Sequence, residues 1–275
     1  MAKICFYTHP HPNVQTYFEM IDLAVEHGLY AVEGLSTFDL AQPNLEHAKY
    51  IKEYADSKGV KFPCFSVFIN LVGQDGADMM QRLKGYADVA KILGSPFLHH
   101  TIASDYRNPD NVLPYRNEFF KKGVAAAAEI FDYCEQKGIR TLVEEQGYLF
   151  NGISGMQTFL DAINRNVGLV ADFGNIYQAD EKIDDYITAF GGLFAHAHVK
   201  DVKIIDDNLN GTGLKTVGGR YMHIAELGFG DVDVKQVIGR LKKTGYDGYY
   251  AIEHTVQKEN VKQMVQTVNT WIEGK

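Results

Sequence analysis

The sequence predicts a single (β/α)₈ barrel over residues 1–275, and three observations lead to this prediction. They are the size and apolar content of the chain, the alternation of short β-rich segments with longer amphipathic ones, and the number of such pairs. The chain has 275 residues, of which 45% are hydrophobic, and α/β barrels commonly reach about 250 residues as one domain. Since no Pro- or Ser-rich linker divides the chain, we expect one domain.

Eight segments have the β-rich composition expected of strands. They cover residues 3–8, 31–35, 61–67, 97–102, 140–146, 167–173, 193–199 and 249–254. Each is followed by a segment with helical spacing, clearest in two sets of apolar residues. These sets are Val234, Val237, Ile238 and Leu241, and Val261, Met264, Val265, Val268, Trp271 and Ile272. Where a helix returns to a strand, a glycine at 28, 59, 138 or 245 predicts a left-handed helix C-cap.

Such units can form a closed barrel or an open, doubly wound sheet. Eight units favour the closed TIM barrel, and no Gly-x-Gly-x-x-Gly motif follows the first strand to indicate a dinucleotide site. In these barrels the chemistry lies at the C-terminal ends of the strands and in the loops after them. The strand ends are therefore where we look for functional residues.

Charge and cysteine content narrow the classes of function. The net charge is −8, and the 27 Lys and Arg residues form no long basic run, so we expect no nucleic-acid partner. Cys5, Cys64 and Cys134 are odd in number and show no Cys-x-x-Cys spacing, which predicts reduced thiols. There is no signal peptide pattern and no apolar run near the roughly 20 residues of a membrane span. We therefore expect a cytoplasmic protein without a membrane partner.

The last four expected strands end in residues that bind metals. They are Glu144 or Glu145, Asp172, His198, and Glu253 or His254. Three carboxylates and one imidazole from one arc of the rim suit one divalent ion, with Mn²⁺, Co²⁺ or Mg²⁺ favoured and Zn²⁺ also compatible. A single strand-end carboxylate is often only a helix cap or a surface charge. Four such residues at the ends of four consecutive strands predict a metal site.

The motifs around these residues carry a resemblance to a known family. They are 142–147 (LVEEQG), 169–175 (LVADFGN), 196–201 (HAHVKD), 228–233 (GFGDVD) and 245–253 (GYDGYYAIE). With them the chain resembles the sugar phosphate isomerase/epimerase superfamily of xylose-isomerase-like barrels over nearly all its length. That superfamily includes ketose 3-epimerases, hydroxypyruvate isomerases, inosose dehydratases and apurinic endonucleases. The resemblance implies that the metal ligands are Glu144, Asp172, His198 and Glu253, and it selects Glu144 over Glu145.

The chain departs from the family pattern at two places. The family usually has His three residues after the ligand Asp, where it contacts substrate or a second metal, but this chain has Asn175. We therefore expect one metal ion, with Asn175 as a candidate substrate contact. The endonuclease branch also needs histidines on earlier strands, whereas the third strand here closes with residues 65–68 (FSVF). This speaks against a role in DNA repair.

Other rim residues are candidates for substrate binding. Lys200 follows His198 in its motif. Of the neighbours His99 and His100, one is expected to face the barrel mouth; we expect a substrate contact from His100, with a buried structural role as the alternative. Glu33 ends the second strand, where family members often hold Glu, and it is either a substrate contact or a hydrogen-bonded rim carboxylate.

Two loops also hold candidates. Residues 200–231 form an unusually long connection, which indicates either a functional lid whose Arg220 and His223 reach the substrate or a solvated surface loop. Residues 9–12 (HPHP) follow the first strand and look like a metal clip, but prolines at this spacing more simply end a strand and start a helix. We do not assign a metal site there.

The resemblance implies a metal-dependent isomerase or epimerase acting on a small sugar or cyclitol. A proton next to a carbonyl would be removed to give an enediolate and then returned, with Glu144 and Glu253 as the acid and base. Two alternatives remain open. One is an inosose-type dehydratase, in which the same enolate expels a β-hydroxyl, and the other is a sugar-binding barrel without catalysis. The apolar and aromatic helix faces permit a homo-oligomer.

Overall fold

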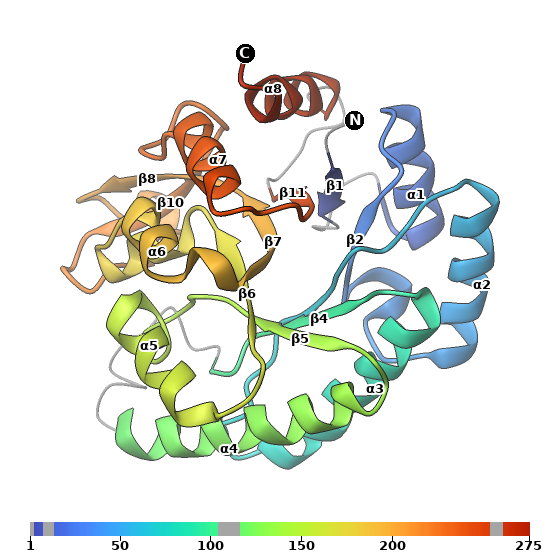
Figure 1. The fold of residues 1–275 in the computed structure, drawn as a ribbon, viewed down its shortest axis with the longest axis horizontal. Coiled ribbons are helices and arrows are strands. Elements are labelled where there is room, and N and C mark those ends of the chain that lie inside the picture. The colour runs from blue at the N-terminus through green and yellow to red at the C-terminus, as the bar shows by residue number, and fades with distance from the viewer. Residues whose placement is uncertain (1–2, 8–13, 104–115, 254–260) are drawn as a thin grey trace.

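Eight parallel strands close into a barrel, and helices surround it (Figure 1). A computed structural model describes residues 3–7, 14–103, 116–253 and 261–275 of the chain. The barrel strands are β1 (Ile4–Tyr7), β2 (Val32–Leu35), β3 (Phe65–Val67), β4 (Phe97–His100), β5 (Arg140–Val143), β6 (Gly168–Asp172), β7 (Phe194–Val199) and β11 (Tyr250–Ile252). Their order around the barrel is β1-β11-β7-β6-β5-β4-β3-β2. The predicted (β/α)₈ barrel and all eight of its strands are confirmed.

The helices lie outside the barrel in chain order. They are α1 (Tyr17–Glu26), α2 (Leu45–Ser57), α3 (Gly76–Leu93), α4 (Arg116–Glu135), α5 (Gly152–Ile163), α6 (Ile183–Phe190), α7 (Val234–Lys243) and α8 (Val261–Glu273). The apolar spacing predicted for α7 faces the barrel, because Val234, Val237, Ile238 and Leu241 are all buried. In α8 the four most buried residues are Val261, Met264, Val268 and Ile272. None of the helices in the described ranges is long and apolar enough to span a bilayer.

The ends of the helices follow from their local sequence. Thr16 and Glu19 form a capping box at the start of α1, which satisfies backbone N–H groups that have no partner within the helix. At the helix-to-strand joints, Gly28, Gly59 and Gly138 have φ of 73°, 71° and 71°, and Gly245 has 87°. A side chain strains this left-handed conformation, so glycine is the residue expected there. The predicted C-caps are confirmed.

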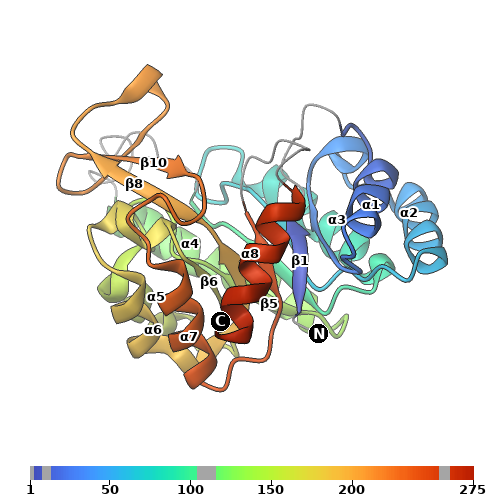
Figure 2. The same ribbon diagram turned by 90° about the horizontal axis from the view of Figure 1, so that it is seen from above.

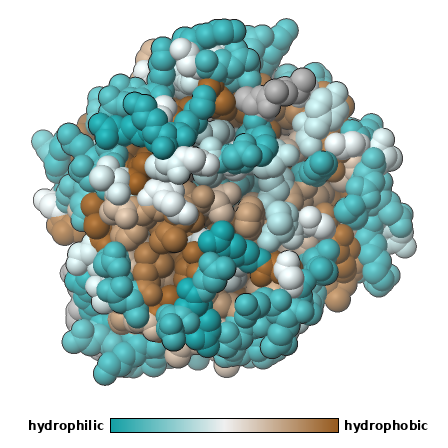
Figure 3. All heavy atoms as spheres, viewed as in Figure 1, coloured by the Kyte–Doolittle hydropathy of each residue, from teal (hydrophilic) through white to brown (hydrophobic). Residues whose placement is uncertain are grey.

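The main core lies between the barrel and its helices, where most of the buried aliphatic and aromatic residues form one cluster. Burial of this apolar surface is the main stabilising contribution to the fold. The three cysteines are buried free thiols, as predicted. On the face of the molecule seen in Figure 1, hydrophilic residues dominate the outline and hydrophobic residues show between them (Figure 3).

The long connection after β7 is a small sheet and not a loop. It contains β8 (Asp201–Ile205), β9 (Leu214–Lys215) and β10 (Tyr221–Ala225), paired antiparallel in the order β8-β10-β9. The sheet projects from the barrel on the side toward which β1 runs (Figure 2). The expectation of a solvated loop for residues 200–231 is therefore corrected, because backbone hydrogen bonds pair three strands within this segment.

Candidate metal centre

The four predicted metal ligands meet at one end of the barrel. Asp172 ends β6 and is in register with His198 of β7, while Glu144 and Glu253 directly follow β5 and β11. The His198 Nδ1 atom lies 3.4 Å from Glu144 Oε2, 3.6 Å from Asp172 Oδ2 and 3.2 Å from Glu253 Oε2. One atom from each side chain thus faces a common point.

This geometry suits a cation. All four side chains are at most 8% exposed. In the described part of the chain, His198 Nδ1 and Glu144 Oε2 are buried without a hydrogen-bond partner. Buried polar atoms are almost always paired, and three buried carboxylates gathered at one point need positive charge among them. Three oxygen donors and one imidazole nitrogen match the ligand preferences of Mn²⁺, Co²⁺, Mg²⁺ or Zn²⁺.

Burial and neighbouring charges change the acidity of the ligands. Burial raises the pKa of Glu144 to about 7, although His198 acts in the opposite direction. Burial would lower the pKa of His198, but Glu33 and the three ligand carboxylates outweigh it and raise that pKa well above the ordinary value. Without a metal, the site therefore tends to hold protons, which an incoming divalent ion would displace.

Lys200 is buried beside the ligands and uses its ammonium group to organise them. It donates to Asp172 Oδ2 at 2.9 Å and Asn175 Oδ1 at 3.2 Å, and lies 2.8 Å from Glu253 Oε1. Burial opposes its charge, but Asp172 and Glu253 raise the pKa of Lys200 above its ordinary value. Since three acceptors match its three N–H bonds, Lys200 remains charged and holds the two ligand carboxylates in place.

Asn175 lies at the first residue of a 3₁₀ helix, η4 (Asn175–Ala179). Its backbone N–H and that of Gly174 both donate to Asp172 Oδ1 at 2.8 Å, which leaves Asp172 Oδ2 for the cluster. Because Lys200 can only donate, the amide oxygen of Asn175 must face it. The amide Nδ2 of Asn175 is then a buried donor without an acceptor among the described residues. This placement is compatible with the predicted substrate contact.

The orientation predicted for the histidine pair on β4 is wrong. His100 packs against Phe131 of α4, and its Nδ1 lies 3.0 Å from the carbonyl oxygen of Thr101. It is His99 that points into the barrel, with its ring 5.4 Å from that of His198 and its Nε2 atom 3.5 Å from Glu144 Oε1. Alternation along a strand puts the two on opposite faces, but the sequence does not say which face each takes.

The two glutamates after β5 also differ in direction. Glu144 faces His198, whereas Glu145 is fully buried and makes no ion pair within the described residues. Burial raises the pKa of Glu145 well above its ordinary value, and Asp172 adds to this. The geometry is consistent with the choice of Glu144 that the family resemblance implies.

Glu33 lies deeper in the barrel and is fully buried. It interacts with His196, His198 and Ser66, which fits a hydrogen-bonded carboxylate better than a substrate contact. The sequence offered a signal for His196, because in residues 196–198 (HAH) two histidines share one face of the strand. Nothing local connects either histidine to Glu33, which is more than 160 residues away.

The remaining candidates do not join the cluster. Arg220 donates to Asp206 Oδ1 at 3.1 Å and to the Ile204 carbonyl oxygen at 2.6 Å, and it is half exposed. His223 Nε2 lies 3.1 Å from the Asp207 carbonyl oxygen. The structure thus places both side chains in contacts within the small sheet and its connecting loop. His9, His11 and His254 lie outside the described residues.

Comparison with known proteins gives the same fold. Residues 21–273 match the family model described as xylose isomerase-like TIM barrel. A curated relative, the uncharacterized protein MJ1311 of Methanocaldococcus jannaschii, is 24% identical over 169 residues, 56% of this chain and 52% of its own length. The chain therefore spans about half the length of that relative.

Solved structures align along nearly the whole chain. 3-Keto-D-glucoside 4-epimerase (YcjR) of E. coli has a TM-score of 0.75 at 14% identity and covers 100% of both chains. The probable 3-DHS dehydratase AsbF of Bacillus anthracis has a TM-score of 0.74 at 15% identity, covering 97% of this chain and 98% of its own. A xylose isomerase-like protein of Mycobacterium smegmatis, solved with magnesium, has a TM-score of 0.71 at 13% identity, and the alignment covers 99% of this chain and 98% of its own. The chain belongs to the xylose isomerase-like TIM barrel family.

Proposed function

We propose that the protein is a metal-dependent isomerase or epimerase that moves a proton next to the carbonyl of a small sugar. The observation that carries this proposal is the convergence of Glu144, Asp172 and Glu253 on the bare Nδ1 of His198. Such a site has the donors for one divalent ion and the carboxylates for acid–base chemistry.

One divalent ion would be held by Glu144, Asp172, His198 and Glu253. When bound, it would supply a Lewis acid that draws negative charge from substrate oxygen atoms and so lowers the cost of an enediolate. The oxygen-rich donor set favours Mn²⁺, Co²⁺ or Mg²⁺, and Zn²⁺ is also compatible. The magnesium in the Mycobacterium smegmatis neighbour supports an ion of this class.

Glu144 and Glu253 are the proposed acid and base. They approach His198 Nδ1 from strands on opposite sides of β6 and β7, which places them on two flanks of the ligand cluster. In the metal-free site burial raises the pKa of Glu144 to about 7, so this buried carboxyl takes up a proton more readily than an exposed glutamate, as an acid–base group requires. One glutamate would remove the substrate proton and the other would return it. Return to the same carbon gives an epimer, and return to the neighbouring carbon gives an isomer.

A dehydratase is the second candidate, and the AsbF neighbour favours it. The same enolate of a cyclic ketone would expel a β-hydroxyl in place of taking up a proton. Asn175 lies beside the ligands with its amide Nδ2 unpartnered among the described residues, which makes it the proposed contact to the departing or retained hydroxyl.

Product analysis in D₂O tests both candidates. Protein stripped with chelator and reloaded with Mn²⁺, Co²⁺, Mg²⁺ or Zn²⁺ is incubated with a panel of ketoses and keto-cyclitols, and the products are analysed by mass spectrometry and NMR. Deuterium at the carbon next to the carbonyl, without loss of mass as water, supports the isomerase or epimerase. Loss of water supports the dehydratase. Bound metal with neither result across the panel contradicts both and supports a sugar-binding barrel.

A further inference from the structure

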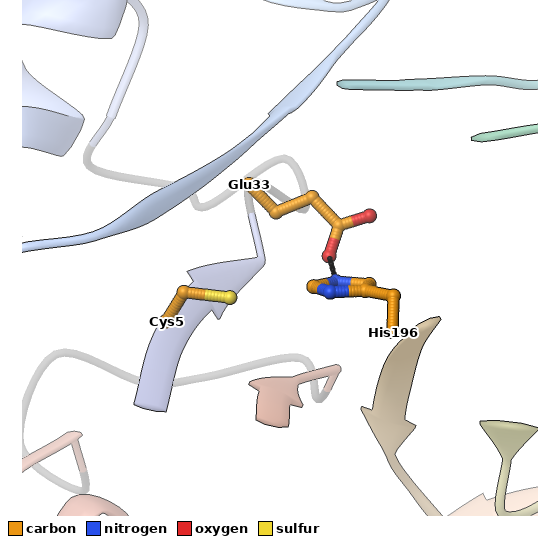
Figure 4. Close-up of side chains that lie close together, drawn as sticks. All are labelled: Cys5, Glu33 and His196. Atoms are coloured by element: carbon orange, nitrogen blue, oxygen red, sulfur yellow. Dashed lines mark hydrogen bonds and ion pairs between the residues drawn. The ribbon is translucent and has the colours of Figure 1, made fainter. Parts of the chain in front are cut away.

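Glu33 is the centre of a buried polar cluster inside the barrel, below the proposed ligands. Its Oε2 atom lies 2.6 Å from His196 Nε2, and its Oε1 atom lies 3.1 Å from His198 Nε2. The hydroxyl of Ser66 also donates to Oε1. Figure 4 shows Glu33 reaching from β2 toward His196 on β7, with its second oxygen directed away from that ring. One carboxylate therefore links β2 with β7, two strands that are not neighbours in the barrel.

The contacts of Glu33 fix where protons lie. Three groups that can each donate a hydrogen bond surround it, namely the rings of His196 and His198 and the hydroxyl of Ser66. A carboxylate accepts from all three, which places a proton on the Nε2 atom of His198. Metal binding requires a neutral imidazole, and with the proton kept on Nε2 the other nitrogen then has the lone pair. That nitrogen is Nδ1, which faces the three ligand carboxylates.

The same carboxylate acts on His99 through Ser66. Ser66 donates its single hydroxyl proton to Glu33. In the 2.9 Å contact between His99 Nδ1 and Ser66 Oγ, the donor must therefore be His99. His99 Nε2 is then left with a lone pair 3.5 Å from Glu144 Oε1. Two imidazoles thus present lone pairs toward the cluster, and both depend on Glu33.

We propose that Glu33 is a positioning residue that holds the proton on His198 Nε2 and so presents Nδ1 to the metal. This inference rests on the proposed metal centre. Metal-binding histidines usually donate their second N–H to a carboxylate or carbonyl, and loss of such a partner typically weakens metal binding by about 10- to 100-fold. Glu33 has the position for this role, because it is fully buried and contacts the Nε2 atom of His198.

The neighbouring thiol does not make this cluster a second metal site. Cys5 points toward Glu33 and His196 in Figure 4, and the three side chains offer ligand atoms within 4.8 Å of one another. However, Glu33 and His196 already share a 2.6 Å hydrogen bond. The other oxygen of Glu33 lies 3.1 Å from His198 Nε2, so both oxygens of Glu33 are engaged by imidazole nitrogens, one of them from the proposed ligand His198.

Matched substitutions test this role by Zn²⁺ affinity, measured by competition with a chelating dye. Glu33→Met keeps the volume but removes every acceptor, and we expect it to weaken Zn²⁺ binding by about 10- to 100-fold. Glu33→Gln retains one acceptor and should fall between Glu33→Met and the wild type. Glu145→Met makes the same exchange at another buried glutamate that lacks an imidazole partner, and it should change the affinity by less than about threefold. Equal Zn²⁺ affinity in Glu33→Met and the wild type overturns the proposal.

A second measurement needs no substitution at Glu33. In Zn²⁺-loaded protein with ¹⁵N-labelled histidine, long-range ¹H–¹⁵N spectra should show His198 with a slowly exchanging proton on Nε2 and the metal on Nδ1. Its signals are identified by their loss in His198→Gln. Metal on Nε2, or a proton on Nδ1, overturns the proposal even if Glu33→Met does not fold. Failure of the wild type to bind any of Zn²⁺, Mn²⁺, Co²⁺ and Mg²⁺ overturns the metal centre itself, whereas Zn²⁺ binding unaffected by Glu33→Met overturns only the role of Glu33.

Discussion

The ligand cluster and the small sheet after β7 are joined through Lys200, yet they place their polar side chains in opposite environments. Glu144, Asp172, His198 and Glu253 are at most 8% exposed. In the sheet, Arg220 is 52% exposed and pairs with Asp206, which is 92% exposed. Inside a closed barrel, alternation forces every second side chain inward, so polar residues there carry a desolvation cost. A sheet with a free face has no such constraint.

From this difference we expect activity to depend on the ligand cluster and the small sheet to tolerate substitution. Exposed ion pairs contribute only about 0–1 kcal/mol to stability, whereas removal of one partner from a buried charged cluster leaves the others uncompensated.

His198→Ala should cause the largest loss of metal. It removes the nitrogen on which the three carboxylates converge. Loss of a residue that only hydrogen-bonds to a metal ligand weakens metal binding by up to about 100-fold, so we expect loss of the ligand itself to exceed that. Activity should recover partly at high metal concentration if coordination is the only role of His198. Metal content after dialysis, together with activity against metal concentration, measures both effects. Full occupancy in this variant would show that the ion is bound elsewhere.

Glu144→Gln and Glu253→Gln should separate proton transfer from metal binding. Each exchange keeps the size and one oxygen ligand but removes the base, so kcat should fall by about 100-fold or more while part of the metal is retained. Steady-state kinetics at saturating metal, with metal analysis of the same samples, gives both quantities. Near-wild-type kcat in both variants with metal bound would make these carboxylates ligands only, and His99 and Lys200 would be the next residues to test.

Metal affinity should depend on pH through Glu144. Because burial raises the pKa of Glu144 to about 7 in the metal-free protein, this carboxyl is protonated below that pH and must lose its proton to bind metal. Affinity should therefore fall as the pH drops below 7, by roughly tenfold per unit from this group alone. In Glu144→Gln, the slope of the logarithm of metal affinity against pH should be smaller by about one below pH 7, because this variant has one proton fewer to release. Equal slopes in both proteins, measured by isothermal titration calorimetry, would assign the dependence to another group.

Arg220→Gln and His223→Gln should have the smallest effects. Their contacts are with Asp206, Ile204 and Asp207 and not with the ligands. We expect kcat/KM to change by less than about threefold and the melting temperature by no more than a few degrees. A rise in KM of tenfold or more in either variant would show that the sheet reaches the substrate. This is the result expected if residues 200–231 form a lid.

The sequence alone predicted the parts of the fold that depend on local pattern. Apolar spacing, glycine caps and the count of strands identified the barrel. The rule that barrel chemistry lies at the C-terminal strand ends identified Asp172 and His198 as neighbours. The strands were predicted too long, as in 140–146 against Arg140–Val143, because the β-rich composition continues past the last paired residue.

Other features depend on contacts that no local pattern contains. The direction of His99 and His100 depends on the register of β4 between β3 and β5. The contact of Glu33 with His196 joins residues 163 positions apart and exists only because the barrel closes. The small sheet was missed because β9 has two residues and several glycines separate its strands, so its composition resembles that of a loop.

The central claim is that one divalent ion binds among Glu144, Asp172, His198 and Glu253, and a crystal structure of the Mn²⁺-loaded protein tests it most directly. Anomalous scattering locates manganese independently of the protein atoms. We predict a single strong peak within about 2.5 Å of one atom from each of the four side chains, with His198 contributing Nδ1. A fully loaded crystal with no peak among these residues, or with its peak at another site, would contradict the account.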